Sequence, residues 1–107
     1  MTYQTISLTQ DERGIATILL NRPDKHHAMN RQMIDEMTQA FRHLADDKAA
    51  RVIVLASTGP TFCAGGDLGW MQEQMAADRA GKMAEARALS DMLTILNTLP
   101  KPVIARV

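Results

Sequence analysis

The sequence predicts an α/β fold, in which strands and helices alternate along the chain. Four segments of strand length either alternate apolar with polar residues or form short uninterrupted apolar runs. Three other segments repeat their apolar residues every three or four positions, as amphipathic helices do. With 107 residues, 46% of them hydrophobic, the chain can form one small domain with a modest core.

The first two predicted strands form a hairpin. Residues 5–9 alternate apolar and polar side chains, and residues 15–20 are rich in β-branched and aliphatic ones. Gly14, between them, favours a tight turn. Pro23 ends the second strand because it has no backbone N–H to donate.

A helix is predicted to begin after Asn30, which is a suitable N-cap. Its core face combines methionine with other apolar residues at helical spacing: Met33, Met37, Ala40, Phe41 and Leu44. Residues 52–56 form an uninterrupted apolar run. Such a run predicts a strand in the middle of the sheet, covered on both faces.

Two more helices and a strand are predicted for the second half. The short segment 61–67 leads into a helix that begins near Leu68. A long helix over 78–99 follows, with an apolar stripe of Ala86, Leu89, Leu93 and Leu96. Residues 103–107 are predicted to form a buried strand with no turn or cap after it. The chain is therefore expected to be truncated after this strand.

Charge and cysteine content argue against several functional classes. Twelve basic and twelve acidic residues cancel, so nothing favours a nucleic acid or an anionic membrane surface as partner. The single cysteine, Cys63, cannot form an intrachain disulfide. No segment approaches the roughly 20 apolar residues of a membrane-spanning helix, and the first residues lack a secretion signal. A cytoplasmic location is expected.

The segment 62–68, Phe-Cys-Ala-Gly-Gly-Asp-Leu, is the part of the sequence that suggests chemistry. A buried strand leads here into two adjacent glycines and then into a helix. The first amides of a helix have no internal acceptor, and the positive end of its dipole stabilises an anion or a developing oxyanion. Glycine also lets a carbonyl group approach the backbone closely. These features predict an oxyanion site for a thioester, with Asp67 capping the helix rather than acting as an acid or base.

Three segments resemble the enoyl-CoA hydratase/isomerase (crotonase) family in order and spacing. They are Leu-Asn-Arg-Pro-Asp-Lys at 20–25 with Ala-Met-Asn at 28–30, the glycine segment at 62–68, and Leu-Pro-Lys-Pro-Val-Ile-Ala at 99–105. The resemblance implies a spiral of ββα turns, of which residues 1–107 would be the N-terminal portion of a single domain. Gly-Trp-Met at 69–71 most resembles the branch that hydrates methylglutaconyl-CoA and related branched or carboxylated esters.

The resemblance also implies roles for individual residues. Gly66 matches the residue that supplies the first of two oxyanion N–H groups, and it is the one expected catalytic group. The expected substrate contacts are Lys25, His26, Ala28, Ala64, Gly65, Gly66, Asp67 and Leu68. Coenzyme A enters as part of the substrate, so no cofactor is implied, and the histidines and Cys63 lack the spacing of a zinc site. Family members usually assemble as trimers or pairs of trimers.

The chain departs from the family pattern at two positions and at its end. Many members carry alanine where this chain has Gly66 and asparagine where it has His27, and neither change removes a backbone N–H. The family's second oxyanion glycine and its catalytic glutamates follow the strand on which the chain ends. The 107 residues alone are therefore expected to show negligible hydration.

The favoured function is that of a lyase that adds water to a 2-enoyl-CoA thioester, and three alternatives stay open. Double-bond isomerisation uses the same fold and the same oxyanion site. A truncated unit that only binds CoA esters would be noncatalytic. A thiol hydrolase would use Cys63 as its nucleophile, although no partner histidine is evident. A phosphate-binding P-loop does not fit, because the segment 59–66 is not followed by the required lysine.

Overall fold

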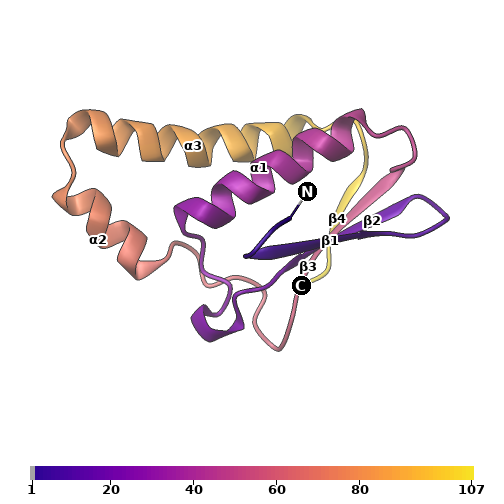
Figure 1. Ribbon diagram of the computed structural model, residues 1–107, viewed down its shortest axis with the longest axis horizontal. Coiled ribbons are helices and arrows are strands. Elements are labelled where there is room, and N and C mark those ends of the chain that lie inside the picture. Colours follow the sequence, from indigo (N-terminus) through magenta and orange to yellow (C-terminus); the bar gives the residue numbers. More distant parts are fainter. Residues whose placement is uncertain (1) are drawn as a thin grey trace.

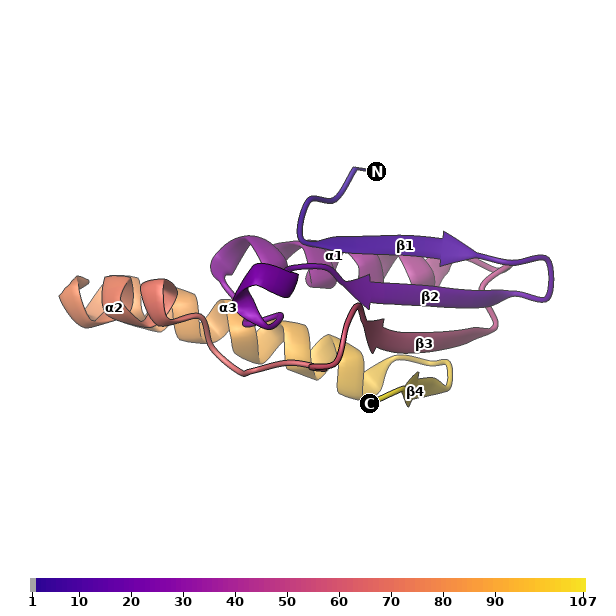
Figure 2. The same ribbon diagram turned by 90° about the horizontal axis from the view of Figure 1, so that it is seen from below.

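The computed structural model describes residues 2–107 and shows a four-stranded sheet with helices packed on one face (Figures 1 and 2). The strands lie in the order β1 (Ile6–Gln10), β2 (Ile15–Leu20), β3 (Val52–Ser57) and β4 (Val103–Ala105). The helices are α1 (Arg31–Asp46), α2 (Leu68–Ala76) and α3 (Arg79–Thr98), with a 3₁₀ turn, η1 (Pro23–Lys25). Helices α1 and α3 pack against each other, whereas α2 lies beyond the end of the sheet. The predicted α/β class is confirmed.

The predicted hairpin is present, and local hydrogen bonds explain its turn. Strands β1 and β2 pair in antiparallel orientation. The Asp11 carboxylate accepts the amides of Arg13 and Ile15, as Asp does in many turns. Gly14 has a φ of +84°, and a Cβ there would lie 2.6 Å from the Ala49 carbonyl oxygen. Only glycine fits this position.

Helix α1 covers one face of the sheet and forms the core with it. The Asn30 side chain accepts the Met33 amide at 2.9 Å and caps the helix as predicted. The predicted core face is buried: Met33, Met37, Ala40, Phe41 and Leu44. It packs against alternate residues of β2 and β3: Ala16, Ile18, Leu20, Ile53 and Leu55. At the other end of α1, the Lys101 ammonium group donates to the carbonyls of Leu44 and Asp47.

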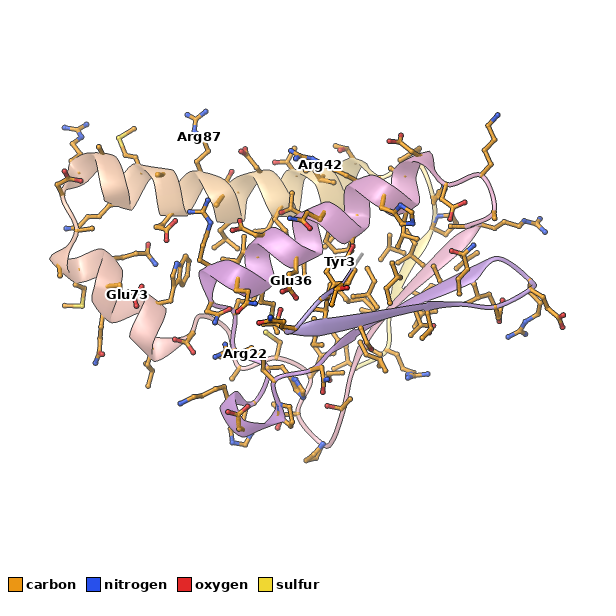
Figure 3. The ribbon with its side chains drawn as sticks, in the orientation of Figure 1. Tyr3, Arg22, Glu36, Arg42, Glu73 and Arg87 are labelled. Atoms are coloured by element: carbon orange, nitrogen blue, oxygen red, sulfur yellow. The ribbon has the colours of Figure 1, made fainter. Side chains whose placement is uncertain are left out.

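A buried carboxylate ties the start of the chain to α1. Figure 3 shows Glu36 on α1 beside the start of β1. Its oxygens accept the Gln4 amide at 3.0 Å, the Thr5 amide at 2.9 Å and the Thr5 hydroxyl at 2.8 Å. The side-chain amide of Gln32 donates as well, at 3.2 Å. These donors compensate for removing the carboxylate from water.

Strand β3 lies between β2 and β4, as predicted, and its two faces are buried to different extents. Ile53 and Leu55 face the core. On the opposite face, Val52 and Val54 are half-buried and Ala56 is 1% exposed. The expectation of a strand covered on both faces is therefore met only in part within residues 2–107. Helices α1 and α3 both lie on the core side of the sheet (Figure 2).

The predictions for the last helix and strand need two corrections. Met92 is the buried residue of α3, at 1% exposure, whereas Leu93 is 49% exposed and Ala86 is exposed as well. Leu89 and Leu96 are partly buried against the core, so the predicted stripe is right for these two residues and misses Met92. Strand β4 is shorter than the predicted 103–107 and is not buried, since Ile104 is 55% exposed at the edge of the described sheet.

The pairing of β2 with β3 decides where the functional segments meet. The two strands are parallel, with Leu20 opposite Ser57, so both end at the same edge of the sheet. The loops that follow them, residues 21–30 and 58–67, therefore leave the sheet side by side (Figure 1). The crevice beyond the carboxyl ends of parallel strands is where α/β sheets bind ligands.

Candidate functional site

The two loops are joined through their backbones, and Met29 and Gly66 form a parallel β-bridge at the junction. The bonds run from the Met29 amide to the Gly65 carbonyl at 2.7 Å, from the Asp67 amide to the Met29 carbonyl at 2.8 Å, and from the Ala64 amide to the His26 carbonyl at 3.0 Å. In such a bridge the residues that flank Gly66 make both bonds to Met29, so the N–H of Gly66 points the other way. Within residues 2–107 this amide has no hydrogen-bond acceptor.

A cavity of about 660 Å³ lies between these loops and the start of α2, and Gly66 lines it. Its walls are formed by Arg22, Asp24, Lys25, His26, Ala28, Ala64, Gly66, Asp67, Leu68 and Gly69. All the predicted site residues except Gly65 line this cavity. The structure therefore brings together two groups that are far apart in the sequence.

The two glycines of the loop have different conformations. Gly65 has a φ of +96°, and a Cβ there would meet nothing within 4 Å, so the backbone angle rather than space requires glycine. Gly66 is not in the left-handed region, and a Cβ there would lie 3.3 Å from the Met71 sulfur. A small shift of the Met71 side chain would make room for alanine.

Asp67 caps α2, as the sequence predicted. Its Oδ1 accepts the Trp70 amide at 2.9 Å, and its Oδ2 lies 3.2 Å from Nη2 of Arg22. The amide of Trp70, together with the charge of Arg22, holds the pKa of Asp67 below its usual value despite partial burial. An ionised carboxylate with both oxygens engaged is poorly suited to accept a proton as a general base.

Arg22 is a residue of this site that the sequence analysis did not assign to it. Its side chain is only 15% exposed, and Nη1 donates to the Ala28 carbonyl while Nη2 meets Asp67. Figure 3 shows Arg22 below the start of β1, at the loops that leave the sheet. An arginine before Pro23 has no local feature that separates it from a solvated turn residue, so the sequence carried no signal for this role.

His27 joins the two loops from the inside. It is 1% exposed, its Nδ1 accepts the Arg22 amide at 3.0 Å, and its Nε2 lies 2.6 Å from the Thr58 carbonyl oxygen. Both contacts are hydrogen bonds only if the ring is neutral with its proton on Nε2. Its φ of 58° lies in the left-handed region, where asparagine and histidine are enriched among non-glycine residues. The role of His27 is therefore structural.

The rim of the cavity carries polar and charged side chains of both signs. Lys25 and His26 are exposed there, and Nδ1 of His26 lies 3.3 Å from the Thr61 hydroxyl. Asp24 is an exposed carboxylate on the same wall. With the free amide of Gly66 near the positive end of α2, this arrangement suits a ligand that has an anionic part and a carbonyl group.

Cys63 has the surroundings of a structural thiol. The Gly65 amide donates to its sulfur at 3.4 Å. The rings of His26 and His27 are bonded elsewhere, and no histidine nitrogen contacts Sγ among residues 2–107. Residues 2–107 therefore place no histidine base beside Cys63 for a thiol hydrolase.

Within residues 2–107, no three side chains of His, Cys, Asp or Glu are grouped so that they could hold a metal ion. None of the helices in this part of the chain has the length and apolar character needed to cross a lipid bilayer.

The profile of the protein family described as enoyl-CoA hydratase/isomerase matches residues 10–107. The chain belongs to this family. It is 38% identical over 102 residues to the Mycobacterium tuberculosis protein named "Probable enoyl-CoA hydratase echA6", and the match covers 95% of this chain and 38% of that protein. It is also 30% identical over 113 residues to the human mitochondrial Delta(3,5)-Delta(2,4)-dienoyl-CoA isomerase, with coverage of 98% and 34%.

A solved member of the enoyl-CoA hydratase/isomerase family has the same fold. The enoyl-CoA hydratase from Shewanella pealeana superimposes with a TM-score of 0.92 and 34% sequence identity, covering 95% of this chain and 38% of that one. The crotonase fold predicted from the sequence is confirmed. This chain spans well under half the length of each of these family members.

Proposed function

We propose that this chain is the acyl-CoA-binding part of an enoyl-CoA hydratase, a lyase that adds water across the double bond of a 2-enoyl-CoA thioester. The observation that carries the proposal is the Gly66 amide, which lacks an acceptor within residues 2–107 and belongs to a residue that lines a cavity near the N-terminus of α2. Two of the three similar proteins described above are named enoyl-CoA hydratases.

The proposed reaction needs a stabilised oxyanion. When the oxygen of water bonds to the β-carbon, electron density moves onto the thioester oxygen, and a proton then adds to the α-carbon. Gly66 is the group that we assign to this oxygen. A preorganised N–H donor in a water-excluded site contributes roughly 3–4 kcal/mol to the transition state of such a reaction.

The remaining walls of the cavity are proposed to hold the rest of the substrate. Lys25 and His26 offer cationic or hydrogen-bonding groups to the phosphates of coenzyme A, and Ala28 and Ala64 offer small surfaces beside them. Gly65 contributes through the backbone turn that presents Gly66. Coenzyme A enters as part of the substrate, so the proposal includes no separate cofactor.

The acid and base of the reaction are not assigned to this chain. Asp67, which we place against the substrate together with Leu68, is bonded to Trp70 and Arg22, and Asp24 is exposed to solvent. The 107 residues are therefore proposed to bind and polarise the thioester with negligible turnover, as the N-terminal part of one crotonase-like domain. Assembly into trimers or hexamers and a cytoplasmic location belong to the same proposal.

The acyl group of the substrate and the choice between hydration and isomerisation are two further parts of the proposal. Residues 69–71 alone support a branched or carboxylated ester such as methylglutaconyl-CoA, and this assignment stays a prediction. Isomerisation is the second candidate reaction, because the chain is 30% identical to the human dienoyl-CoA isomerase. Both reactions develop charge on a thioester oxygen, so one oxyanion site serves either.

Calorimetric titration with two ligands tests the proposal. Crotonyl-CoA carries the thioester carbonyl, whereas S-but-2-enyl-CoA is a thioether that lacks it. We expect crotonyl-CoA to bind about three- to tenfold more tightly, as one additional hydrogen bond provides. Equal affinities would contradict an oxyanion site at Gly66, and steady hydration of crotonyl-CoA by the pure chain would contradict the assignment of binding without turnover.

A further inference from the structure

Arg22 connects the two sides of the cavity. Its guanidinium group donates to the Ala28 carbonyl on one loop and pairs with the Asp67 carboxylate on the other, at 3.2 Å. Its backbone amide also donates to the ring of His27. Arg22 itself lines the cavity. The Arg22 side chain thus connects the loops 21–30 and 58–67, and a ligand in the cavity would contact both loops.

The Asp67 carboxylate divides its two oxygens between two tasks. Oδ1 accepts the Trp70 amide and caps α2, and Oδ2 faces Arg22. Asparagine caps a helix about as well as aspartate does, so the cap alone does not require a charge. The negative charge is explained by the contact with Arg22, because an unpaired charge at a position only 14% exposed would be unfavourable.

We propose that Arg22 and Asp67 form a positioning pair that holds the Gly66 amide in register with the segment Lys25–Ala28. Asp67 directly follows Gly66, so a displacement of its side chain shifts the peptide plane between the two residues and with it the Cα of Gly66, to which the Gly66 amide is attached. Arg22 fixes that side chain relative to Ala28, on the opposite loop. The inference rests on the proposed function, since it concerns how a thioester oxygen meets Gly66 while the rest of the ligand lies on the other loop.

The geometry favours arginine over lysine at this position. The planar guanidinium group directs N–H donors at two acceptors on different segments at once. A lysine ammonium would keep the charge but could not reproduce this fixed fork. The conservative variant R22K is therefore expected to position the Gly66 amide less well than arginine does but better than an uncharged side chain. If only the charge of Arg22 mattered, R22K would behave like the unchanged chain.

The test measures thioester preference, defined as the affinity for crotonyl-CoA divided by that for S-but-2-enyl-CoA. In R22M and in D67N we expect this ratio to fall about three- to tenfold, with R22K between these variants and the unchanged chain. Affinity for the thioether should change much less. A pair that served only folding would lower both affinities together, or neither.

A matched control is available in the first hairpin. Arg13 pairs with Asp11 at 2.8 Å, and these residues do not line the cavity. The variant R13M should leave the thioester preference unchanged. Because D67N keeps the cap of α2, it allows the test even if R22M does not fold.

A second measurement does not depend on binding. Hydrogen exchange at the amides of Met29 and Asp67 reports the bonds that hold the bridge with Gly66. Both amides should exchange faster in D67N and R22K than in the unchanged chain. An unaltered thioester preference in folded D67N and R22K would overturn the positioning pair but leave the proposed function standing. Absence of any preference in the unchanged chain would overturn the proposed function and the inference that rests on it.

Discussion

Met29 and Gly66 face each other in a parallel β-bridge, and this contact fixes the backbone on either side of the free amide. The Gly65 carbonyl and the Asp67 amide are both bonded to Met29. The orientation of the Gly66 N–H is thus set by its neighbours. A side chain at position 66 should therefore matter less than the backbone angle at position 65.

The variants G65A and G66A are expected to differ. Alanine at 65 must adopt a φ near +96°, which should lower the free energy of unfolding by about 1–2 kcal/mol. Alanine at 66 requires only that Met71 shift slightly, and the change should stay within about 0.5–1 kcal/mol in either direction. Urea unfolding of both variants measures these differences.

The control for the glycine variants is G59A. Gly59 also has a positive φ, at +72°, and no atom would crowd an added Cβ. Since Gly59 does not line the cavity, G59A should lose stability much as G65A does, without losing affinity for crotonyl-CoA. G65A should bind crotonyl-CoA less tightly than the unchanged chain, because position 65 sets the backbone of the loop. If G66A lost as much affinity as G65A, the side chain at position 66 would obstruct the site.

Replacement of His27 should be strongly destabilising unless its hydrogen bonds are restored. In H27L the buried Arg22 amide and Thr58 carbonyl lose their partners, and we expect the free energy of unfolding to fall by about 2–4 kcal/mol. Asparagine in H27N tolerates the left-handed backbone and can bond one of the two groups, so the free energy of unfolding should fall less than in H27L. The exposed His43 provides the control H43L, which should change stability by less than about 0.5 kcal/mol.

Glu36 should make stability depend on pH in the acid range. Burial alone raises its pKa, but hydrogen bonds from Thr5, Gln4 and Gln32 outweigh burial, so the folded pKa lies below the ordinary value of 4.5. Its contribution is complete above pH 4.5 and is lost as the pH falls through the folded pKa. Unfolding measured from neutral to acid pH should therefore show a shallower decline below pH 4.5 in E36Q than in the unchanged chain.

The matched control for Glu36 is the exposed Glu73 on α2. E73Q should leave the acid decline as it is, whereas E36Q should also lower stability at pH 7 by about 1–2 kcal/mol. Identical acid profiles for E36Q and the unchanged chain would show that Glu36 does not hold the first residues against α1.

Lys101 should stabilise the C-terminal end of α1. Its ammonium group donates to the carbonyls of Leu44 and Asp47 at the end of the helix, and the Asp47 carbonyl also accepts the Ala50 amide. The variant K101M should lower the free energy of unfolding by about 1 kcal/mol. The exposed Lys48, close to the same helix end, gives the control K48M, for which thermal or urea unfolding should show almost no change.

Local features of the sequence predicted the local features of the fold. Asn30 and Asp67 could be assigned as caps because capping depends on residues within one helical turn. The core face of α1 was equally clear, because its apolar residues occupy a single side. In α3, apolar and small residues surround more of the helix, and only packing against α1 selects Met92 over Leu93.

The residues of the site could be predicted only where they belong to a short contiguous sequence motif. The glycine segment could be singled out from its own residues, and the residues around Lys25 from the family resemblance, and both groups line the cavity. Arg22 could not, because its role depends on Asp67, 45 residues further along the chain. That contact exists because β2 and β3 are parallel neighbours, and strand pairing is a property of the whole fold.

The central claim is that the Gly66 amide is free in the unliganded chain and bonds the thioester oxygen. Nuclear magnetic resonance of the ¹⁵N-labelled chain tests it directly, by following this amide during titration with crotonyl-CoA and with S-but-2-enyl-CoA. We predict that the amide exchanges rapidly with water before ligand is added, and that its proton shifts downfield with the thioester but not with the thioether. An amide already protected in the free chain, or one that responds equally to both ligands, would contradict the account.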